Sequence, residues 1–249
     1  MNRLVRAEGY RLLHSGIYLR SMLLFCLLLS LFPLLTDFSL RDKSLAENMG
    51  TFSLNGVMLI WVVPLIVTVF VANGYLKKTA YYEVMAGNKN FGIIGSKLVV
   101  DGFFMGIICF VFTIWLGVTV AVKNGIGAVE EIPLRLMLLF VICLHVTALA
   151  VLIGLAVKHP IAAAMVVYLR FQMFDLLFAE ILPMFMERWA LGEAVCVKLR
   201  RCTVIRQITE VFGPEIGSEI VIATLGSFLV EILLWYGIVY FTMRKKWYK

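Results

Sequence analysis

Long stretches without charged residues recur along the chain and predict helices that cross a membrane. A crossing helix needs about 20 mostly apolar residues, and residues 48–76, 102–122 and 136–157 contain no Asp, Glu, Lys or Arg. Residues 160–186 and 220–243 are apolar with few charges. The pattern predicts six spans, at about 17–36, 56–73, 98–122, 134–157, 160–184 and 220–243.

All six spans are expected to be helical. Within lipid, a backbone satisfies its own hydrogen bonds only in helices or in a closed barrel, and the alternating pattern of a barrel strand is absent here. The first span has a short apolar stretch. It is expected to begin near Ile17, with Arg20 reaching back to the headgroups.

The composition agrees with this pattern. Of the 249 residues, 61% are hydrophobic and 16% are charged, whereas a soluble domain has about 45–50% and about 25%. One core cannot bury such an excess, because surface area limits how much a chain of this size hides. A soluble enzyme and a disordered chain are therefore excluded. The predicted fold class is an all-α integral membrane protein, with residues 1–249 forming a single transmembrane domain.

The distribution of charge predicts the orientation. With the N-terminus inside, the cytoplasmic segments carry 13 basic and 2 acidic residues, and the outer segments carry 9 basic and 10 acidic residues. Because cytoplasmic segments are enriched in Lys and Arg, both termini are predicted to be cytoplasmic. The net charge of +7 then favours contact with anionic headgroups. No basic groove with aromatic residues points to nucleic acid as a partner.

The first 16 residues are predicted to form a short amphipathic helix in the cytoplasmic interface. Leu4, Val5, Leu12 and Leu13 would form its apolar side, opposite several arginines. An ordinary charged flank is an equally good interpretation of the same residues.

A long outer segment, residues 187–219, precedes the last span. It contains no proline before Gly213-Pro214, so one or two helices are predicted that end at this break. Cys196 and Cys202 lie in this segment and are candidates for a disulfide. Reduced thiols are the preferred interpretation, since a helix holds residues six apart too far from each other for a bridge.

A glycine-rich stretch resembles a phosphate loop only superficially. Gly87-x4-Gly92 is followed by Ile93, where the motif requires Lys and then Ser or Thr. ATP binding by this chain, and a cofactor of its own, are therefore not expected. The three scattered histidines have no paired spacing for a metal site.

A second motif suggests a protease. Glu130-Glu131-x3-Arg135 resembles the E-E-x3-R motif of CAAX-type intramembrane proteases. Those enzymes also need a histidine four residues after Phe, and neither His145 nor His159 has Phe at that place. The motif is therefore interpreted as charged residues that flank a membrane helix on its outer side.

Polar residues inside the predicted spans are candidates for a translocation path or for contacts between subunits. Each costs at least ~2.5 kcal/mol at the bilayer centre if it faces lipid. Arg170 and Asp175 are about 140° apart around a helix, so each is expected to find its partner on another helix or subunit. Asp101, at the start of the third span, is expected to be a flank. The candidates are Arg170, Gln172, Asp175, Glu180 and Glu231.

The cytoplasmic segment 74–97 carries a resemblance to a known family. Residues Ala72–Leu98 resemble the loop between the second and third spans of type-2 ABC transporter permeases, and Val84 stands where Leu is usual. The family's glutamate, glycine and arginine positions are occupied here by Gly74, Lys78 and Asn90. The matching residues are Tyr75, Thr79, Gly87, Ile93, Ser96, Lys97 and Leu98.

This resemblance implies a coupling helix that rests in a cleft of a cytoplasmic ATPase subunit. Thr79 would cap the helix, residues 80–86 would form it, and Gly87 would end it in a left-handed conformation. Aromatic and apolar side chains would anchor it. A plain amphipathic linker is the alternative. The implied coupling residues are Tyr75, Thr79, Tyr81, Tyr82, Val84, Met85, Gly87 and Lys97.

The resemblance implies that the chain is the permease subunit of an ATP-driven exporter in a bacterial cell membrane. The chain would not be an enzyme itself: Mg-ATP would bind to separate ATPase subunits, and a second permease, identical or homologous, would complete the path. A peptide antibiotic or another amphipathic molecule is the substrate suggested by analogy. A standalone channel or secondary carrier is the alternative, although the inverted repeats usual in carriers are absent.

Overall fold

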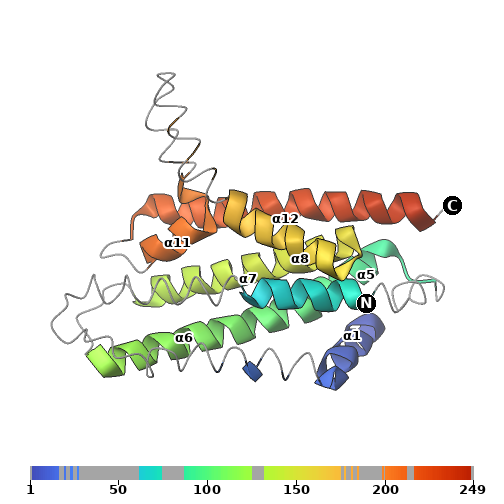
Figure 1. The fold of residues 1–249 in the computed structure, drawn as a ribbon, viewed down its shortest axis with the longest axis horizontal. Helices are drawn as coiled ribbons and strands as arrows, with labels where there is room; N and C mark the ends of the chain where they lie inside the picture. The colour runs from blue at the N-terminus through green and yellow to red at the C-terminus, as the bar shows by residue number, and fades with distance from the viewer. Residues whose placement is uncertain are drawn as a thin grey trace.

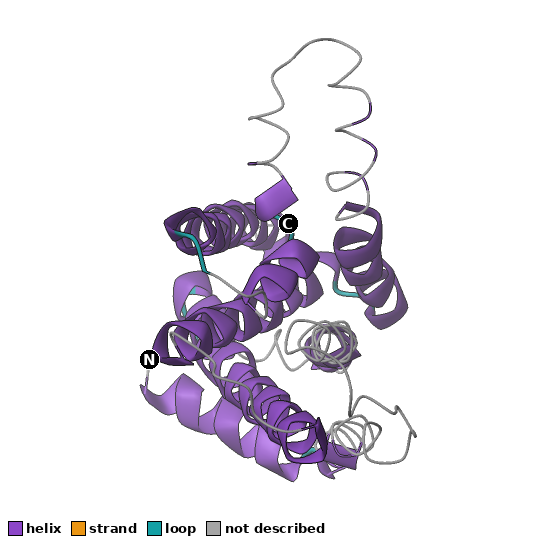
Figure 2. Cartoon of the chain, turned by 90° about the vertical axis from the view of Figure 1, so that its left-hand side faces the viewer, coloured by secondary structure: helices purple, strands orange, loops and turns teal. Residues whose placement is uncertain are grey.

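The computed structural model describes residues 2–16, 20, 23, 24, 27, 62–74, 87–124, 132–174, 177, 181, 184, 198, 200–211 and 216–247. These residues are almost entirely helical, and none of them forms a strand (Figure 2). The predicted all-α class is therefore confirmed for the part of the chain that the structure describes.

The described part of the chain consists of helices, some of which run on without a break into the next. They are α1 (Asn2–His14), the helix Val62–Gly74, α5 (Asn90–Lys97), the π-helix η1 (Leu98–Phe103), α6 (Phe104–Asn124), α7 (Ile132–Val157), α8 (Pro160–Leu169), the π-helix η2 (Arg170–Phe174), α11 (Val204–Val211) and α12 (Ser218–Trp247). In Figure 1, α1, α5, the α7–α8 turn and the C-terminal end of α12 lie at the right-hand end, and α11 lies at the opposite end.

Three helices in the described part are long and apolar enough to cross a membrane: Asn90–Trp115, Pro133–Val157 and Ser218–Met243. They correspond to the third, fourth and sixth predicted spans. The apolar helices Val62–Gly74 and Pro160–Leu169 are shorter. They fall in the second and the fifth predicted span. Most of the predicted first span lies outside the described residues, so the number of six spans stays a prediction.

The third of the predicted spans begins earlier than expected. Lys89 is extended and α5 starts at Asn90, running without a break through η1 into α6. The helix therefore begins eight residues before the predicted start of the span at residue 98, and the last eight residues of the segment 74–97 are part of it. The reason is that Gly87, with φ +79°, breaks the chain direction ahead of Asn90, and a helix can then form.

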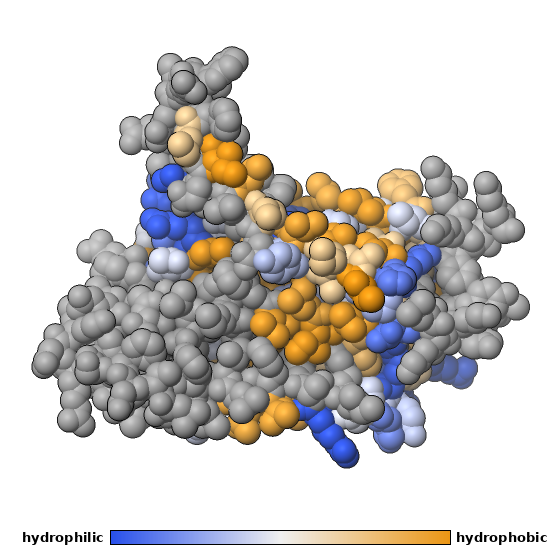
Figure 3. Space-filling model, in the orientation of Figure 1, coloured by the Kyte–Doolittle hydropathy of each residue, from blue (hydrophilic) through white to orange (hydrophobic). Residues whose placement is uncertain are grey.

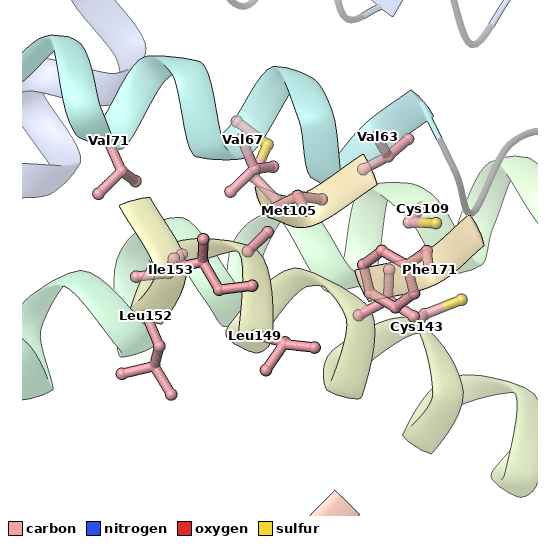
Figure 4. Packing of buried hydrophobic residues seen from close by; sticks show 14 of the residues in the cluster. Val63, Val67, Val71, Met105, Cys109, Cys143, Leu149, Leu152, Ile153 and Phe171 are labelled. Carbon is pink, nitrogen blue, oxygen red and sulfur yellow. The ribbon is translucent and has the colours of Figure 1, made fainter. Parts of the chain in front are cut away.

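Helix α7 is at the centre of the packing and contacts α12, α6, η1, α8 and α11. About two thirds of the central window of α7 is buried, against about a tenth of that of α12, most of which is half-buried or exposed. On the helix Val62–Gly74, three valines spaced by four residues face the α7 side chains, as Figure 4 shows. Val63, Val67, Val71, Leu149, Leu152 and Ile153 are all buried in this core.

Small residues allow two helix pairs to approach closely. Gly102 and Gly106 in η1 and α6 are spaced as small-xxx-small, a spacing common at membrane helix interfaces. A Cβ at Gly106 would lie 2.7 Å from Leu144 Cδ2, and Thr147 donates a hydrogen bond of 2.9 Å to the Gly102 carbonyl. Likewise, a Cβ at Gly154 would lie 3.0 Å from a backbone oxygen of the helix Val62–Gly74.

The turn between α7 and α8 reverses the chain within two residues. Lys158 has φ +63°, and the extended His159 accepts a hydrogen bond of 3.4 Å from the Ala162 N–H through its side chain. Pro160 follows at the first position of α8, where its missing N–H costs nothing. This tight turn makes α7 and α8 neighbours.

Candidate functional site

The predicted coupling residues lie mostly outside the described residues. The coupling residues outside the described part are Tyr75, Thr79, Tyr81, Tyr82, Val84 and Met85. Gly87 is described, and its φ of +79° is the left-handed conformation that was predicted for it. The coupling helix predicted before it, at residues 80–86, lies outside the described residues and stays a prediction.

Lys97, the last predicted coupling residue, is only 2% exposed and lies at the end of α5. Its ammonium donates a hydrogen bond of 2.9 Å to the carboxylate of Glu8 in α1. Arg11 in α1 also pairs with Glu8, and it donates a hydrogen bond of 3.2 Å to Asp101 in η1. These four residues, Glu8, Arg11, Lys97 and Asp101, form what we call the α1 ion cluster.

The α1 ion cluster is closed. It contains two acidic and two basic side chains, and Asp101 has no exposed surface. The guanidinium of Arg11 also lies 4.5 Å from the ring centre of Phe70, on the helix Val62–Gly74, at a distance typical of a cation–π contact. The cluster therefore fastens three segments that are far apart in the sequence.

Burial and charge act in opposite directions on Glu8. Burial raises the pKa of this carboxyl. The charges of Lys97 and Arg11 together lower it by more than burial raises it, so the pKa lies below its ordinary value. Glu8 is therefore charged at neutral pH, and it completes the ion pair with Lys97 rather than leaving a buried ammonium alone.

The structure corrects two expectations at this end of the molecule, on Asp101 and on the sides of α1, and it adds a contact for Lys97, whose coupling role stays a prediction. Asp101 is buried beneath α1 and is more than a flank. The Lys97 charge is paired within the chain. The predicted amphipathic helix exists as α1, but Leu13 is 59% exposed, and Glu8 and Leu12 are the buried positions. The reason is that α1 packs on η1 and α5, which offer charged partners that the helix pattern alone does not reveal.

A second charged group lies midway along the helices. Arg170, at the start of η2, donates a hydrogen bond of 3.2 Å from Nε to Glu231 in α12, and its Nη2 pairs with the other carboxylate oxygen. The expectation that Arg170 finds its partner on another helix is thus confirmed. The side chain of Gln172, and all of Asp175 and Glu180, lie outside the described residues.

His145 in α7 approaches the same carboxylate and was not predicted as a site residue. Its Nε2 lies 3.6 Å from Glu231 Oε2, and the side chain is fully buried. Neither ring nitrogen has a hydrogen bond. The sequence feature that could have identified His145 as a site residue is its position in the middle of an otherwise apolar predicted span. We call Arg170, Glu231 and His145 the mid-helix cluster.

A pocket of about 670 Å³ opens beside the mid-helix cluster, between α8, η2 and α12. Six of the eight lining side chains are apolar, and the other two are Arg170 and Glu231. Pockets of this size with few polar groups are typical of small-molecule sites. The arrangement can hold an apolar body with one polar end, and it contains no group positioned for covalent chemistry.

The end of the bundle at α11 is held by polar contacts between helices. Arg135, from the protease-like motif, is buried and donates a hydrogen bond of 2.7 Å to the Val211 carbonyl at the end of α11. Gln207 in α11 donates one of 2.9 Å to Ser227 in α12. Among the described residues, no group of three or more His, Cys, Asp or Glu side chains is suited to a metal ion.

The predicted outer segment is described only in part. It contains α11, and Arg201 pairs with Glu210 at 3.6 Å and with Glu219. Cys202 is a free, exposed cysteine, while Cys196 lies outside the described residues. Cys202 therefore forms no disulfide in this structure, as the preferred interpretation of reduced thiols expects for it.

Comparison with known proteins adds no name to this geometry: no protein-family model matches the chain, and no curated protein sequence matches it.

Proposed function

We propose that this chain is the transmembrane subunit of an ATP-driven exporter that resembles the type-2 ABC permeases and works in a bacterial cell membrane. It pairs with an identical or homologous permease, and each permease docks one separate ATPase subunit, which binds Mg-ATP. The observation that carries the proposal is the likeness of residues Ala72–Leu98 to the loop between the second and third spans of that family.

The backbone after this loop supports the proposal. Gly87 has the left-handed conformation required where a coupling helix ends. The unbroken run from α5 through η1 to α6 follows three residues later. A displacement of the loop would therefore be transmitted along a continuous helix into the bundle.

The α1 ion cluster also supports coupling. It joins α1 to the beginning of this helical run through Glu8, Lys97 and Asp101. When the ATPase subunits close on ATP, α1 and α5 would move as one body, which is what a switch between two packed states needs.

The mid-helix cluster is the candidate for the translocation path or for contact with the second permease. Buried polar groups in an apolar helix are functional candidates by default, because they are costly to maintain in lipid. The substrate, by analogy, is a peptide antibiotic or a similar amphipathic molecule.

The same cluster is the observation that favours the alternative function, a standalone channel or secondary carrier. In that case Arg170, Glu231 and His145 would act without an ATPase. The two functions differ in a measurable requirement, since only the exporter needs a nucleotide-hydrolysing partner.

The test is purification of the tagged full chain in mild detergent from its native cells, with Mg-ATP hydrolysis and mass spectrometry as readouts. The exporter predicts a co-purified chain that contains a phosphate-loop motif. Tyr82→Asp combined with Met85→Asp should lower the co-purified ATPase activity about tenfold or more, because anchoring aromatic and apolar side chains dominate such interfaces. Insertion into the membrane should be unchanged.

The matched control is His159→Asp. It adds a negative charge in the α7–α8 turn at the same end of the molecule, and Asp is a good residue for the capping position of His159. This variant should keep the ATPase. Equal recovery in the double variant, or vesicle transport by the chain alone, would contradict the exporter. An intramembrane protease would instead lose its activity with Glu130→Ala, which we expect to leave transport intact.

A further inference from the structure

Helix α11 lies beside the first turns of α12 (Figure 1). Two hydrogen bonds fix its direction. The Val211 carbonyl, at the end of α11, accepts from Arg135 near the beginning of α7, whereas Gln207 donates to Ser227 in α12. The beginning of α11 therefore lies closer to the middle of the bundle than its end, and we call it the deep end of α11.

The deep end comes close to the middle of a predicted span. Glu231 is at the centre of the apolar stretch 220–243. Ser227, the partner of Gln207, precedes Glu231 by four residues, which is about 6 Å along a helix. Cys202 and the turn before α11 follow Gln207 towards the mid-helix cluster.

The backbone at the deep end is a turn. The Thr203 N–H donates a hydrogen bond of 3.1 Å to the Arg200 carbonyl, and neither Cys202 nor Thr203 is helical. Non-helical backbone at membrane depth occurs where it is buried in protein or is in contact with water. Thr203 is buried, but Cys202 is exposed, so the surrounding protein does not fully enclose this turn.

The side of α11 that faces away from the bundle is polar. Cys202, Arg206 and Thr209 are exposed at spacings of four and three residues, which places them on one side of a helix. Arg206 donates a hydrogen bond of 2.9 Å to Glu210 on the same side. In Figure 3, hydrophilic side chains gather over α11 and the first turns of α12, and apolar ones gather over the middle of the molecule. Charged side chains are costly to hold against hydrocarbon, so this side requires a polar surrounding.

The charge of Glu231 acts on the thiol at the deep end. Partial burial raises the pKa of Cys202, and the Glu231 carboxylate raises it further. Glu231 itself is 21% exposed. Cys202 is thus both exposed and within electrostatic reach of Glu231, so water in contact with the thiol is close to the mid-helix cluster.

We propose that water enters from the α11 end along the polar side of α11 and reaches the mid-helix cluster at Glu231. In the predicted topology this is the outer side of the membrane. The water would solvate the polar end of an amphipathic molecule that leaves the pocket beside Glu231, which adds an outward exit to the candidate path. For this role the inference rests on the proposed function, whereas the water contact is measurable by itself.

The native Cys202 is the reporter in the experiment. Right-side-out membrane vesicles that contain the full chain are treated, without nucleotide, with a membrane-impermeant trimethylammonium methanethiosulfonate. The reagent reacts with thiolates, which form in water and are disfavoured in lipid. Peptide mass spectrometry then quantifies each labelled cysteine. Cys202 should be labelled from the outer side, while the buried Cys109 and Cys143 should stay unlabelled, which also shows that the chain is folded.

Leu229→Cys is the matched control. Leu229 lies in α12 between Ser227 and Glu231 and is 56% exposed, but the neighbours one turn away on the same side, Leu225 and Leu233, are exposed and apolar. The introduced thiol should react at least about tenfold more slowly than Cys202 in the same molecule, because lipid disfavours the charged thiolate.

Three outcomes of this labelling would overturn the proposal. Equal rates for Cys202 and the Leu229→Cys thiol would mean that water is not confined to the side of α11. Protection of Cys202 in vesicles, with labelling only in detergent, would mean that lipid or a partner chain covers α11. Labelling in inside-out vesicles alone would place the water on the other side of the membrane.

A further variant tests how far the water contact reaches. Glu231→Gln removes the carboxylate that raises the pKa of Cys202, so the pH profile of Cys202 labelling should shift to lower pH. Glu8→Gln removes the same charge at the other end of the bundle and should leave the profile unchanged. An unchanged profile in Glu231→Gln would overturn the claim that the water reaches the mid-helix cluster.

The labelling needs neither nucleotide nor an ATPase subunit. A negative result therefore removes the water route and leaves the docking of an ATPase standing. Conversely, loss of ATPase docking removes the exporter and leaves the labelling of Cys202 as evidence for water beside α11.

Discussion

The α1 ion cluster and the mid-helix cluster are both built from opposite charges on different helices, yet one is closed and the other is open. In the α1 ion cluster, Glu8, Lys97 and Asp101 are almost fully buried. In the mid-helix cluster, Arg170 and Glu231 border a pocket.

The difference separates two uses of a charge inside a helical bundle. A closed group of buried, paired side chains serves to fasten α1 to α5 and η1. An open group beside an apolar pocket is held less tightly. One side of its charged residues borders space that a ligand can enter. Breaking each cluster should therefore change a different property, stability in the first case and binding in the second.

The largest effect is expected from removal of one charge in the closed cluster. Lys97→Met removes the ammonium that donates a hydrogen bond to the buried Glu8 carboxylate. Breaking a buried ion pair from one side typically costs about 3–5 kcal/mol, so the free energy of unfolding should fall by about that amount. The measurement is denaturation with sodium dodecyl sulfate in mixed micelles.

The control is the double variant Glu8→Leu with Lys97→Met. It removes one acid and one base together, which leaves Arg11 and Asp101 as a pair. Its cost should be smaller than that of Lys97→Met alone, because the Glu8 carboxylate is removed together with the ammonium that pairs with it. A double variant less stable than the single one would mean that the cluster is not held by charge balance.

Acidification should weaken the closed cluster by a smaller amount. Burial raises the pKa of Glu8, but Lys97 and Arg11 lower it below its ordinary value of 4.5. A carboxyl with a lowered pKa contributes stability that is present above its unfolded pKa and is lost as the pH falls through its folded pKa. The free energy of unfolding should thus decline below pH ~4.5, by at most about 1.4 kcal/mol per pH unit for this one proton.

Thermal unfolding in dodecyl maltoside over a series of acidic buffers measures this decline. Glu8→Gln should remove part of the slope, since the residue no longer titrates. An unchanged slope in that variant would assign the acid sensitivity to other carboxyls.

The smallest effect on stability is expected in the open cluster. Arg170→Gln keeps a hydrogen-bond donor near Glu231, and His145 remains on its other side. Polar contacts between membrane helices are worth about 0.6 kcal/mol on average, so the free energy of unfolding should fall by about that amount. Denaturation in the same mixed micelles measures it, and a loss as large as that of Lys97→Met would remove the distinction between the two clusters.

Much of the fold could be predicted from the sequence because it depends on local chemistry. Stretches with few or no charges predicted helices at the third, fourth and sixth spans, and all three are present and long enough to cross a membrane. The helix at the third span begins eight residues before the predicted start, since Asn90 to Lys97 is polar enough to look like a loop yet packs against α1 and η1. The spacing of Gly102 and Gly106 in the sequence indicates close helix packing. The prediction was based on hydropathy and did not consider this spacing.

The candidate site was predictable in its residues and not in its contacts. Arg170 and Glu231 were chosen as costly polar groups inside apolar helices, and the structure brings them together. His145 was missed because a single histidine in a helix is compatible with simple burial. Lys97 was assigned to a partner protein, since the family likeness covers its position and says nothing about α1.

The sequence by itself determined the helical class, the apolar length of the helices and the left-handed turn at Gly87, because each of these depends on neighbouring residues or on sums over a segment. The tertiary structure alone decided which charges meet. Lys97 and Glu8 are 89 residues apart, and Arg170 and Glu231 are 61 apart. At such separations the partner is chosen by the packing of whole helices around α7, where burial makes an unpaired charge too costly to keep.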